Sequence, residues 1–149
     1  MSRLEDIGER DGWRCWLCDE PVDATRSGND DRGPSVDSRT TKTKGKDGGG
    51  VIGLERLAHR ACNTRKGAEK AVAPWATHLF VIDPSPIIES VERLHNKGGR
   101  LVVARCPNKA DADEAAAWLT DRVGRLAPTL RLTVDAEPGG GQFMLVARI

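Results

Sequence analysis

Two pairs of residues with metal-ligand spacing stand far apart in the sequence. Cys15 and Cys18 are separated by two residues, and so are His59 and Cys62. A two-residue spacer lets both side chains of a pair face one ion, and two such pairs complete a tetrahedral shell of three sulfurs and one nitrogen. Zn²⁺ accepts this ligand set because it has no geometric preference that the set would violate. The sequence therefore predicts a structural zinc site at these four residues, and metal binding there would contribute free energy to folding.

The alternative is that these are separate buried cysteines and a surface histidine. The matching spacing of both pairs favours the metal site. Cys106 has no second ligand at a fitting spacing, and we expect an ordinary buried thiol. His78 and His95 are also isolated, and core or capping roles are expected for them.

A carboxylate and a basic segment lie between the two pairs. Asp37 belongs to the stretch SVDSRTTKTKGK, residues 35–46. Residues 1–38 carry five Lys or Arg and ten Asp or Glu, a net charge of −5, whereas residues 39–70 carry nine and three, a net charge of +6. A basic segment in a nearly neutral chain indicates a polyanionic partner. The alternative is a solvated positive face with no partner.

The basic side chains are spaced so that they could follow a phosphate backbone. In an extended conformation, lysines at two-residue intervals would line one edge of the chain. Phosphate contacts supply most sequence-independent affinity for nucleic acid. Aromatic residues make up 4% of the chain and none is tyrosine, which disfavours binding by base stacking. The expected nucleic-acid-binding residues are Lys42, Lys44, Lys46, Arg60, Arg65 and Lys66.

The first half of the chain must position these residues with little regular structure. The patterns predict a short helix or turn over residues 3–11 and a polar loop over 19–50. Residues 53–73 have helical character, and Pro74 is expected to close that helix. The residue pattern changes after this proline, and we therefore predict two domains. They are a metal-binding domain over residues 1–74 and a second domain over 75–149.

The second half has clearer periodicity. Strands are expected at the apolar and β-branched segments, and helices where apolar residues recur at helical spacing before a glycine or after acidic residues. The expected strands are 78–83, 100–106, 130–136 and 142–149, and the expected helices are 86–98 and 111–127. The order is β-α-β-α-β-β, so the whole chain is predicted to be α+β.

Three stretches carry a family resemblance. RDGWRCWLCDEPVD, SVDSR and LERLAHRACNTRKG, within roughly residues 9–70, resemble the HNH endonuclease family in its zinc-ribbon-stabilised form. The resemblance implies a ββα-metal fold in the first domain. It also implies that Asp37 holds a catalytic divalent ion such as Mg²⁺, Mn²⁺ or Ni²⁺, that Asn63 completes this site from a helix, and that Lys66 meets phosphate.

Two positions depart from the family pattern. Ser38 stands where the family has its general-base histidine, and Leu54 stands where it has an asparagine. A serine hydroxyl cannot replace an imidazole, because its pKa lies far above neutral. Losing a positioned general base costs on the order of 10²–10⁴ in rate. We therefore expect a nucleic-acid-binding protein with weak or no nuclease activity. The alternatives are an active metal-dependent endonuclease of DNA or RNA, and a protein- or ribosome-interaction adaptor with a purely structural zinc site.

Residues 75–149 contain no motif that we can tie to chemistry. Their expected element order is similar to small ribosome-binding modules such as the C-terminal domain of the third bacterial translation initiation factor, which suggests contact with protein or ribosome. No run approaches the roughly 20 apolar residues of a membrane span. The N-terminal residues show no secretory signal. We expect a cytoplasmic protein without membrane contact, whose cysteines bind metal or stay free.

Overall fold

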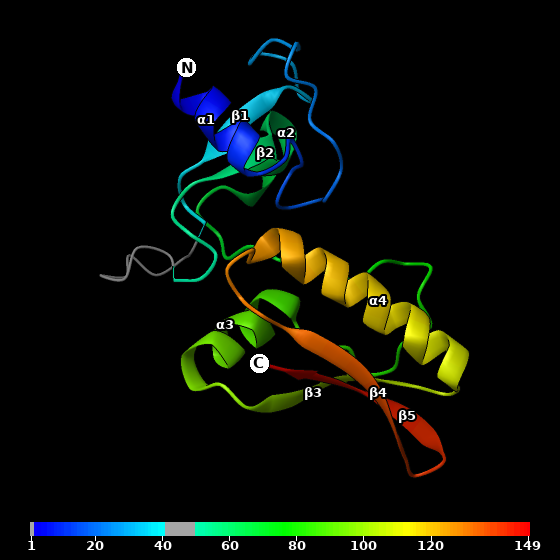
Figure 1. Ribbon diagram of the computed structural model, residues 1–149. Coiled ribbons are helices and arrows are strands. Elements are labelled where there is room, and N and C mark those ends of the chain that lie inside the picture. The colour runs from blue at the N-terminus through cyan, green and yellow to red at the C-terminus, as the bar shows by residue number, and fades with distance from the viewer. Residues whose placement is uncertain (1, 41–49) are drawn as a thin grey trace. The chain divides into compact units, whose positions relative to one another are not determined.

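The structure, a computed structural model, describes residues 2–40 and 50–149 (Figure 1). The chain divides into two compact units, Met1–Ala73 and Pro74–Ile149. This boundary lies one residue from the predicted division. Both units combine helices with antiparallel strands, which confirms the α+β class. Each unit is described separately below.

The first unit begins with a capped helix, α1 (Arg3–Arg10). The Ser2 hydroxyl accepts a hydrogen bond from the Glu5 amide at 3.2 Å, and the Glu5 carboxylate accepts one from the Ser2 amide at 3.1 Å. This reciprocal pair satisfies two amides that a helix start would otherwise leave without partners. The helix predicted over residues 3–11 is confirmed.

A two-stranded sheet and a short helix form the centre of the first unit. Strand β1 (Pro34–Asp37) pairs antiparallel with β2 (Arg56–His59), and α2 (Arg60–Lys66) follows β2 directly. The helix predicted over residues 53–73 is therefore wrong at its start. Arginine, leucine and alanine favour a helix, but every β2 residue is buried, and pairing with β1 overrides this weak local preference.

The predicted end of this helix is also wrong, because α2 stops at Lys66 instead of continuing to Ala73. Gly67 follows with a φ of 56°, a backbone conformation that glycine adopts at little cost and that interrupts a right-handed helix. Its amide donates to the carbonyl of Asn63 and so completes the last turn.

The second unit is a three-stranded antiparallel sheet with two helices on one face (Figure 1). Its strand order is β3-β5-β4, and a two-glycine turn joins the last two strands. Both predicted helices and three of the four predicted strands are present. The elements are α3 (Ile87–Lys97), β3 (Arg100–Cys106), α4 (Lys109–Leu126), β4 (Thr133–Gly139) and β5 (Gln142–Arg148).

The strand predicted over residues 78–83 is wrong. Only Ile82 pairs there, in an isolated bridge with Arg105 of β3. Phe80 is 61% exposed, so the apolar run is not drawn into the core. Asp83 has a φ of 51° and precedes Pro84, a combination that ends extended pairing at this point. The observed order is therefore α-β-α-β-β.

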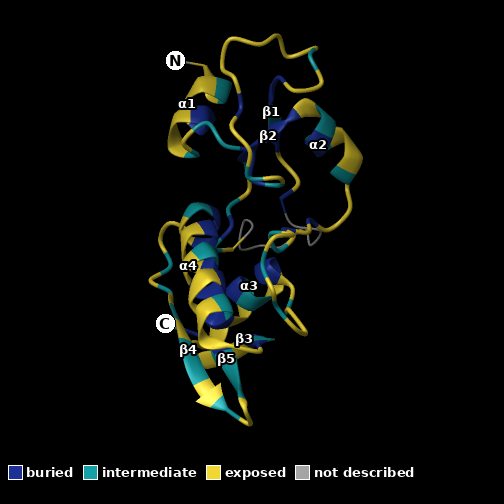
Figure 2. Cartoon of the chain, turned by 90° about the vertical axis from the view of Figure 1, so that its right-hand side faces the viewer, coloured by how far each residue is buried: buried dark blue, intermediate teal, exposed yellow. Residues whose placement is uncertain are grey.

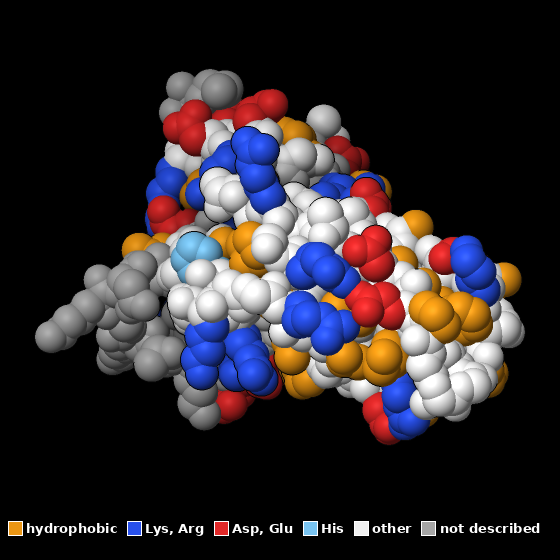
Figure 3. All heavy atoms as spheres, turned by 60° about the horizontal axis from the view of Figure 1, so that its bottom comes forward, with side chains coloured by type: hydrophobic (Ala, Val, Ile, Leu, Met, Phe, Trp, Pro, Cys, Tyr) orange, Lys and Arg blue, Asp and Glu red, His pale blue; other side chains and the backbone are white. Residues whose placement is uncertain are grey.

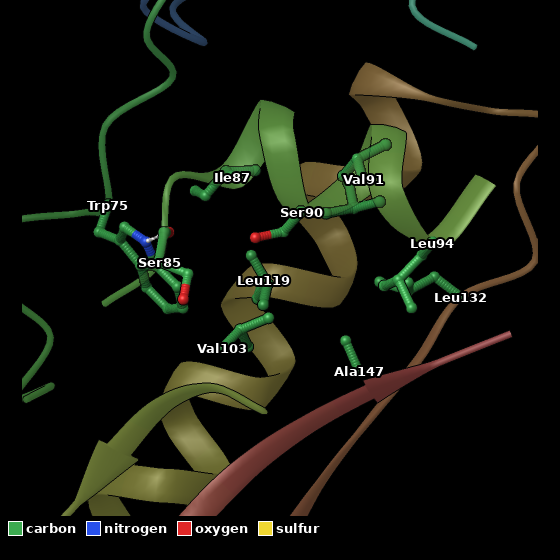
Figure 4. A pocket seen from close by; sticks show the side chains of 11 residues that line it. Trp75, Ser85, Ile87, Ser90, Val91, Leu94, Val103, Leu119, Leu132 and Ala147 are labelled. Atoms are coloured by element: carbon green, nitrogen blue, oxygen red, sulfur yellow. Dashed lines mark hydrogen bonds between the residues drawn. The ribbon is translucent and has the colours of Figure 1, made fainter. Parts of the chain in front are cut away.

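The core of the second unit lies between the helices and the covered face of the sheet. In Figure 2 the buried residues of α4 form one stripe along the helix. A small pocket in this layer is lined by apolar side chains and two serines, without a charged residue (Figure 4). The Trp75 indole donates to the carbonyl of Ser85 at 2.8 Å and stacks on Trp118 with ring centroids 5.7 Å apart. These contacts close the layer at its edge.

The other face of the sheet carries charges that pair with one another. Ala147 lines the pocket, so Arg148 points to the opposite face because side chains alternate along a strand. Arg148 forms ion pairs with Asp135 and Glu137, and Arg100 lies 3.2 Å from Glu137. Figure 3 shows basic and acidic side chains next to one another in the view turned toward the bottom of Figure 1. The face therefore carries little unbalanced positive charge.

No helix in the described part of the chain combines the length and apolar character that crossing a membrane requires.

Candidate metal centre

The four predicted ligands meet at one place in the first unit. The sulfur atoms of Cys15, Cys18 and Cys62 and a ring nitrogen of His59 all lie within 4.8 Å of one another. His59 is the last residue of β2, and Cys62 lies in the first turn of α2. Cys18 is more exposed than the other three. The predicted convergence is confirmed, and this cluster could bind a metal ion.

A tight turn presents the first two sulfurs. The amide of Asp19 donates to the carbonyl of Cys15 at 2.8 Å, and the amide of Cys15 donates to the carbonyl of Glu20 at 2.9 Å. Asp19 has a φ of 65°, which reverses the chain directly after Cys18. The amide of Trp16 donates to the carbonyl of Leu57 at 2.9 Å. This bond fixes the turn against β2, and therefore beside His59.

The imidazole of His59 is oriented by a main-chain bond. Its Nε2 lies 2.9 Å from the carbonyl oxygen of Pro21, and a carbonyl can only accept, so Nε2 carries the proton. Nδ1 then presents its lone pair, 3.3 Å from the sulfur of Cys18 and 3.9 Å from that of Cys62. Burial lowers the pKa of His59, which favours the neutral ring that binds metals.

The thiols of Cys18 and Cys62 resist ionisation. Burial, together with the neighbouring charges of Cys15 and Cys18, raises the pKa of Cys62 to about 12. Burial also raises the pKa of Cys18. A divalent cation among the sulfurs would reverse this, because its charge stabilises thiolates directly. The donor set therefore fits a cation that replaces the thiol protons.

Asp37, the predicted ligand of a catalytic ion, is buried at the end of β1 with 1% of its surface exposed. Its Oδ2 accepts from the Trp16 indole at 3.2 Å and lies 3.3 Å from the Lys66 ammonium. Its Oδ1 accepts from the Arg39 amide at 2.9 Å. Both carboxylate oxygens therefore have donors inside the domain.

Asn63, the expected partner of Asp37, has a different set of contacts. Its side-chain amide donates to the Ser35 hydroxyl at 3.0 Å and to the Val36 carbonyl at 3.2 Å. These bonds hold α2 against β1. Ser38 is exposed, and Leu54 is 55% exposed. The positions expected to carry the base and the orienting amide thus point toward solvent with side chains unsuited to either role.

The predicted phosphate-binding residues divide into four groups. Lys42, Lys44 and Lys46 lie outside the described residues. Arg60 pairs with Asp31 at 3.1 Å, with both side chains exposed. The Lys66 side chain is 5% exposed and faces inward. Arg65 is exposed on α2, and so is Arg39 just after β1. Within residues 2–40 and 50–149, neither of these two arginines has an ion-pair partner.

A buried polar network, which was not predicted from the sequence, lies beside the candidate metal centre. The Arg56 guanidinium lies 3.1 Å from the Asp11 carboxylate and 6.0 Å from the centre of the Trp16 ring. Trp16 in turn donates to Asp37, which pairs with Lys66. Two of the basic residues counted in the positive segment are therefore buried. Asp11 and Arg56 are 45 residues apart, and no local pattern relates them.

Comparison with protein-family models, with curated proteins and with solved structures gave no match. The resemblance to HNH endonucleases over residues 9–70 has no support from these comparisons.

Proposed function

We propose that residues 1–73 form a zinc-binding, HNH-like domain that binds nucleic acid without cleaving it efficiently. The observation that carries this proposal is the enclosure of Asp37 by Trp16, Arg39 and Lys66. A carboxylate with three internal donors is poorly placed to hold a catalytic ion. In this proposal β1, β2 and α2 correspond to the ββα unit of the family.

Zinc is the proposed metal because three sulfurs and one imidazole nitrogen match the ligand set of closed structural zinc sites. Cys15, Cys18, His59 and Cys62 would hold the ion, and bound zinc would link the turn after α1 to the junction of β2 and α2. The test is elemental analysis of the purified protein. Cys62→Ser should lose the metal, whereas Cys106→Ser, a buried cysteine of the second unit, should keep it.

Weak or absent cleavage is expected from the side chains of Ser38 and Leu54. Ser38 cannot act as a general base near neutral pH, and Leu54 offers no hydrogen bond to orient one. Supercoiled plasmid and structured RNA, incubated with Mg²⁺, Mn²⁺ or Ni²⁺, should stay intact. Cleavage that is abolished by Asp37→Asn would instead support the active endonuclease.

Nucleic-acid binding is proposed from the unpaired positive charge of the first unit. Arg39 and Arg65 are exposed near α2, and the sequence adds Lys42, Lys44 and Lys46. Each neutralised phosphate releases counterions. The logarithm of the association constant should therefore fall linearly with the logarithm of the salt concentration. The charge-balanced sheet face of the second unit offers no comparable surface.

Titration of labelled duplex DNA and RNA at several salt concentrations tests this proposal. The double variant Arg39→Ala/Arg65→Ala should weaken binding and reduce the salt slope by about 2, since each lost phosphate contact contributes about 1. The control Arg93→Ala/Arg131→Ala removes two exposed arginines of the second unit and should leave the slope unchanged. Equal effects of both variants, or no binding by the wild type, would contradict the proposal.

A further inference from the structure

The Lys66 ammonium lies inside a ring of oxygen atoms. The carbonyl oxygen of Arg39 is 2.6 Å from Nζ, that of Gly67 is 3.2 Å away and that of Glu69 is 3.5 Å away. Oδ2 of Asp37 completes the ring at 3.3 Å. The side chains of Lys66 and Asp37 are 5% and 1% exposed. A charged group is therefore held among oxygen atoms with little of its side chain open to solvent.

The oxygen atoms define which cations this pocket suits. One carboxylate and three neutral carbonyls carry a single negative charge, which one positive charge balances. The distances exceed those of Mg²⁺, about 2.0–2.1 Å, and most exceed those of Ca²⁺, about 2.3–2.6 Å. They match N–H···O hydrogen bonds from an ammonium group. Main-chain carbonyls also bind K⁺. The donor set is thus one for a large monovalent cation.

We propose that this pocket is a monovalent-cation site that the chain fills with its own lysine. The consequence of this site for catalysis rests on the proposed function. The tethered ammonium neutralises Asp37, and so the carboxylate neither needs nor admits a divalent ion. Lys66 is in this view a built-in inhibitor of metal binding, and its charge is not available to a phosphate.

The backbone keeps the pocket in place without the lysine. Gly67 turns the chain with its positive φ, and the amide of Glu69 donates to the carbonyl of Lys66 at 3.0 Å. The carbonyls of Gly67 and Glu69 therefore stay near the end of α2. The amide of Arg39 is bonded to Asp37, which fixes the other side. Shortening Lys66 should leave an oxygen-lined site that a free cation can enter.

The test is thermal unfolding of the full-length, zinc-loaded Lys66→Ala variant in different chloride salts at equal ionic strength. Ammonium and ethylammonium should raise its Tm by an amount that saturates with concentration, and K⁺ should do so more weakly. Tetramethylammonium cannot donate hydrogen bonds and is too large for the pocket, so it should give no such shift. Wild-type protein should show no difference between these cations.

Two further variants make the test specific to the pocket. Lys66→Met fills it with an apolar side chain, and Asp37→Asn/Lys66→Ala removes its charge. Neither should respond to ammonium. If Lys66→Ala does not fold alone, its refolding yield in ammonium against tetramethylammonium gives the same comparison.

Three results would overturn the proposal. The first is an equal shift of the Lys66→Ala Tm with every cation. The second is a larger stabilisation by Mg²⁺ or Mn²⁺ than by ammonium. The third is a folded Lys66→Ala variant whose Tm does not change with any cation. These measurements do not involve nucleic acid. A failure of wild-type protein to bind DNA or RNA would therefore contradict the proposed function but not the proposed cation site.

Discussion

At the scale of single residues, Asp37 is a buried carboxylate at the end of β1. Trp16 and Lys66 both contact its Oδ2 from within the first unit. A buried carboxylate is stable only with such partners, because an unpaired buried charge is strongly unfavourable. The enclosure of Asp37 is consistent with a structural role in the first unit.

Replacing Asp37 should therefore affect stability before activity. Asp37→Ala leaves the Lys66 ammonium buried without its counter-charge, and the free energy of unfolding should fall by about 3–5 kcal/mol. Asp113→Ala removes an exposed partner of Lys109 and should cost less than about 1 kcal/mol. Urea unfolding of both variants measures the difference. Equal, small losses would show that the Asp37–Lys66 pair does not stabilise the fold.

The expected pH dependence of metal binding also follows from the protonation of individual residues. The raised pKa values of Cys18 and Cys62 mean that these thiols hold protons at neutral pH without a metal, so binding must release them. Affinity should therefore rise with pH. With these two thiols protonated, the gain is about a hundredfold per pH unit, because each proton contributes a factor of ten.

His59 acts in the same direction at lower pH. Its pKa is lowered in the fold, so the neutral ring is retained until the solution is more acidic than the usual histidine midpoint. Competition with a chromophoric chelator between about pH 6 and pH 8, a range that includes the usual histidine midpoint and lies below that of cysteine, measures the slope. A pH-independent affinity would mean that the thiols do not bind the metal as thiolates.

At the scale of elements, the junction of β2 and α2 decides where the metal ligands lie. The strand ends at His59 and the helix begins at Arg60, so a ligand in each element can face the same point. Asn63 ties the helix to β1, and Gly67 ends it. The sequence over this junction favours a helix throughout, and only pairing with β1 makes its first part a strand.

Two glycines should respond oppositely to alanine. Gly67 has a φ of 56°, so Gly67→Ala strains the backbone and should lower the free energy of unfolding by about 1–3 kcal/mol. Gly124 lies within α4 with open space around its missing side chain, and Gly124→Ala should raise it by about 0.5–1 kcal/mol. Thermal unfolding of the two variants distinguishes them. A stabilising Gly67→Ala would exclude the described end of α2.

At the scale of the whole molecule, each unit has its own means of stabilisation. The first relies on a small apolar core, a buried polar network and the four candidate metal ligands. The second packs α3 and α4 on a sheet and uses none of these ligands. A unit of about 70 residues is near the size at which metals commonly supplement a small core.

Metal removal should therefore affect only one unit. Chelation of the protein should increase hydrogen exchange in β2 and α2, because His59 and Cys62 are released, and in β1, because it pairs with β2. Exchange in β3, α4 and β5 should stay the same. Hydrogen exchange followed by mass spectrometry measures both regions in one sample. Increased exchange in both units would show that the second depends on the first.

The sequence by itself determined the four candidate metal ligands, the α+β class and most elements of the second unit. These features depend on short-range spacing and periodicity, which are visible in a few consecutive residues. Only the tertiary structure decided that Arg56–His59 is a strand, that residues 78–83 are not, and that Lys66 and Arg56 are buried. Each of these outcomes depends on partners far away in the chain, such as β1, Asp37 and Asp11. Whether a charged side chain is buried depends on the residues around it in space, and the residues next to it in the sequence do not reveal them.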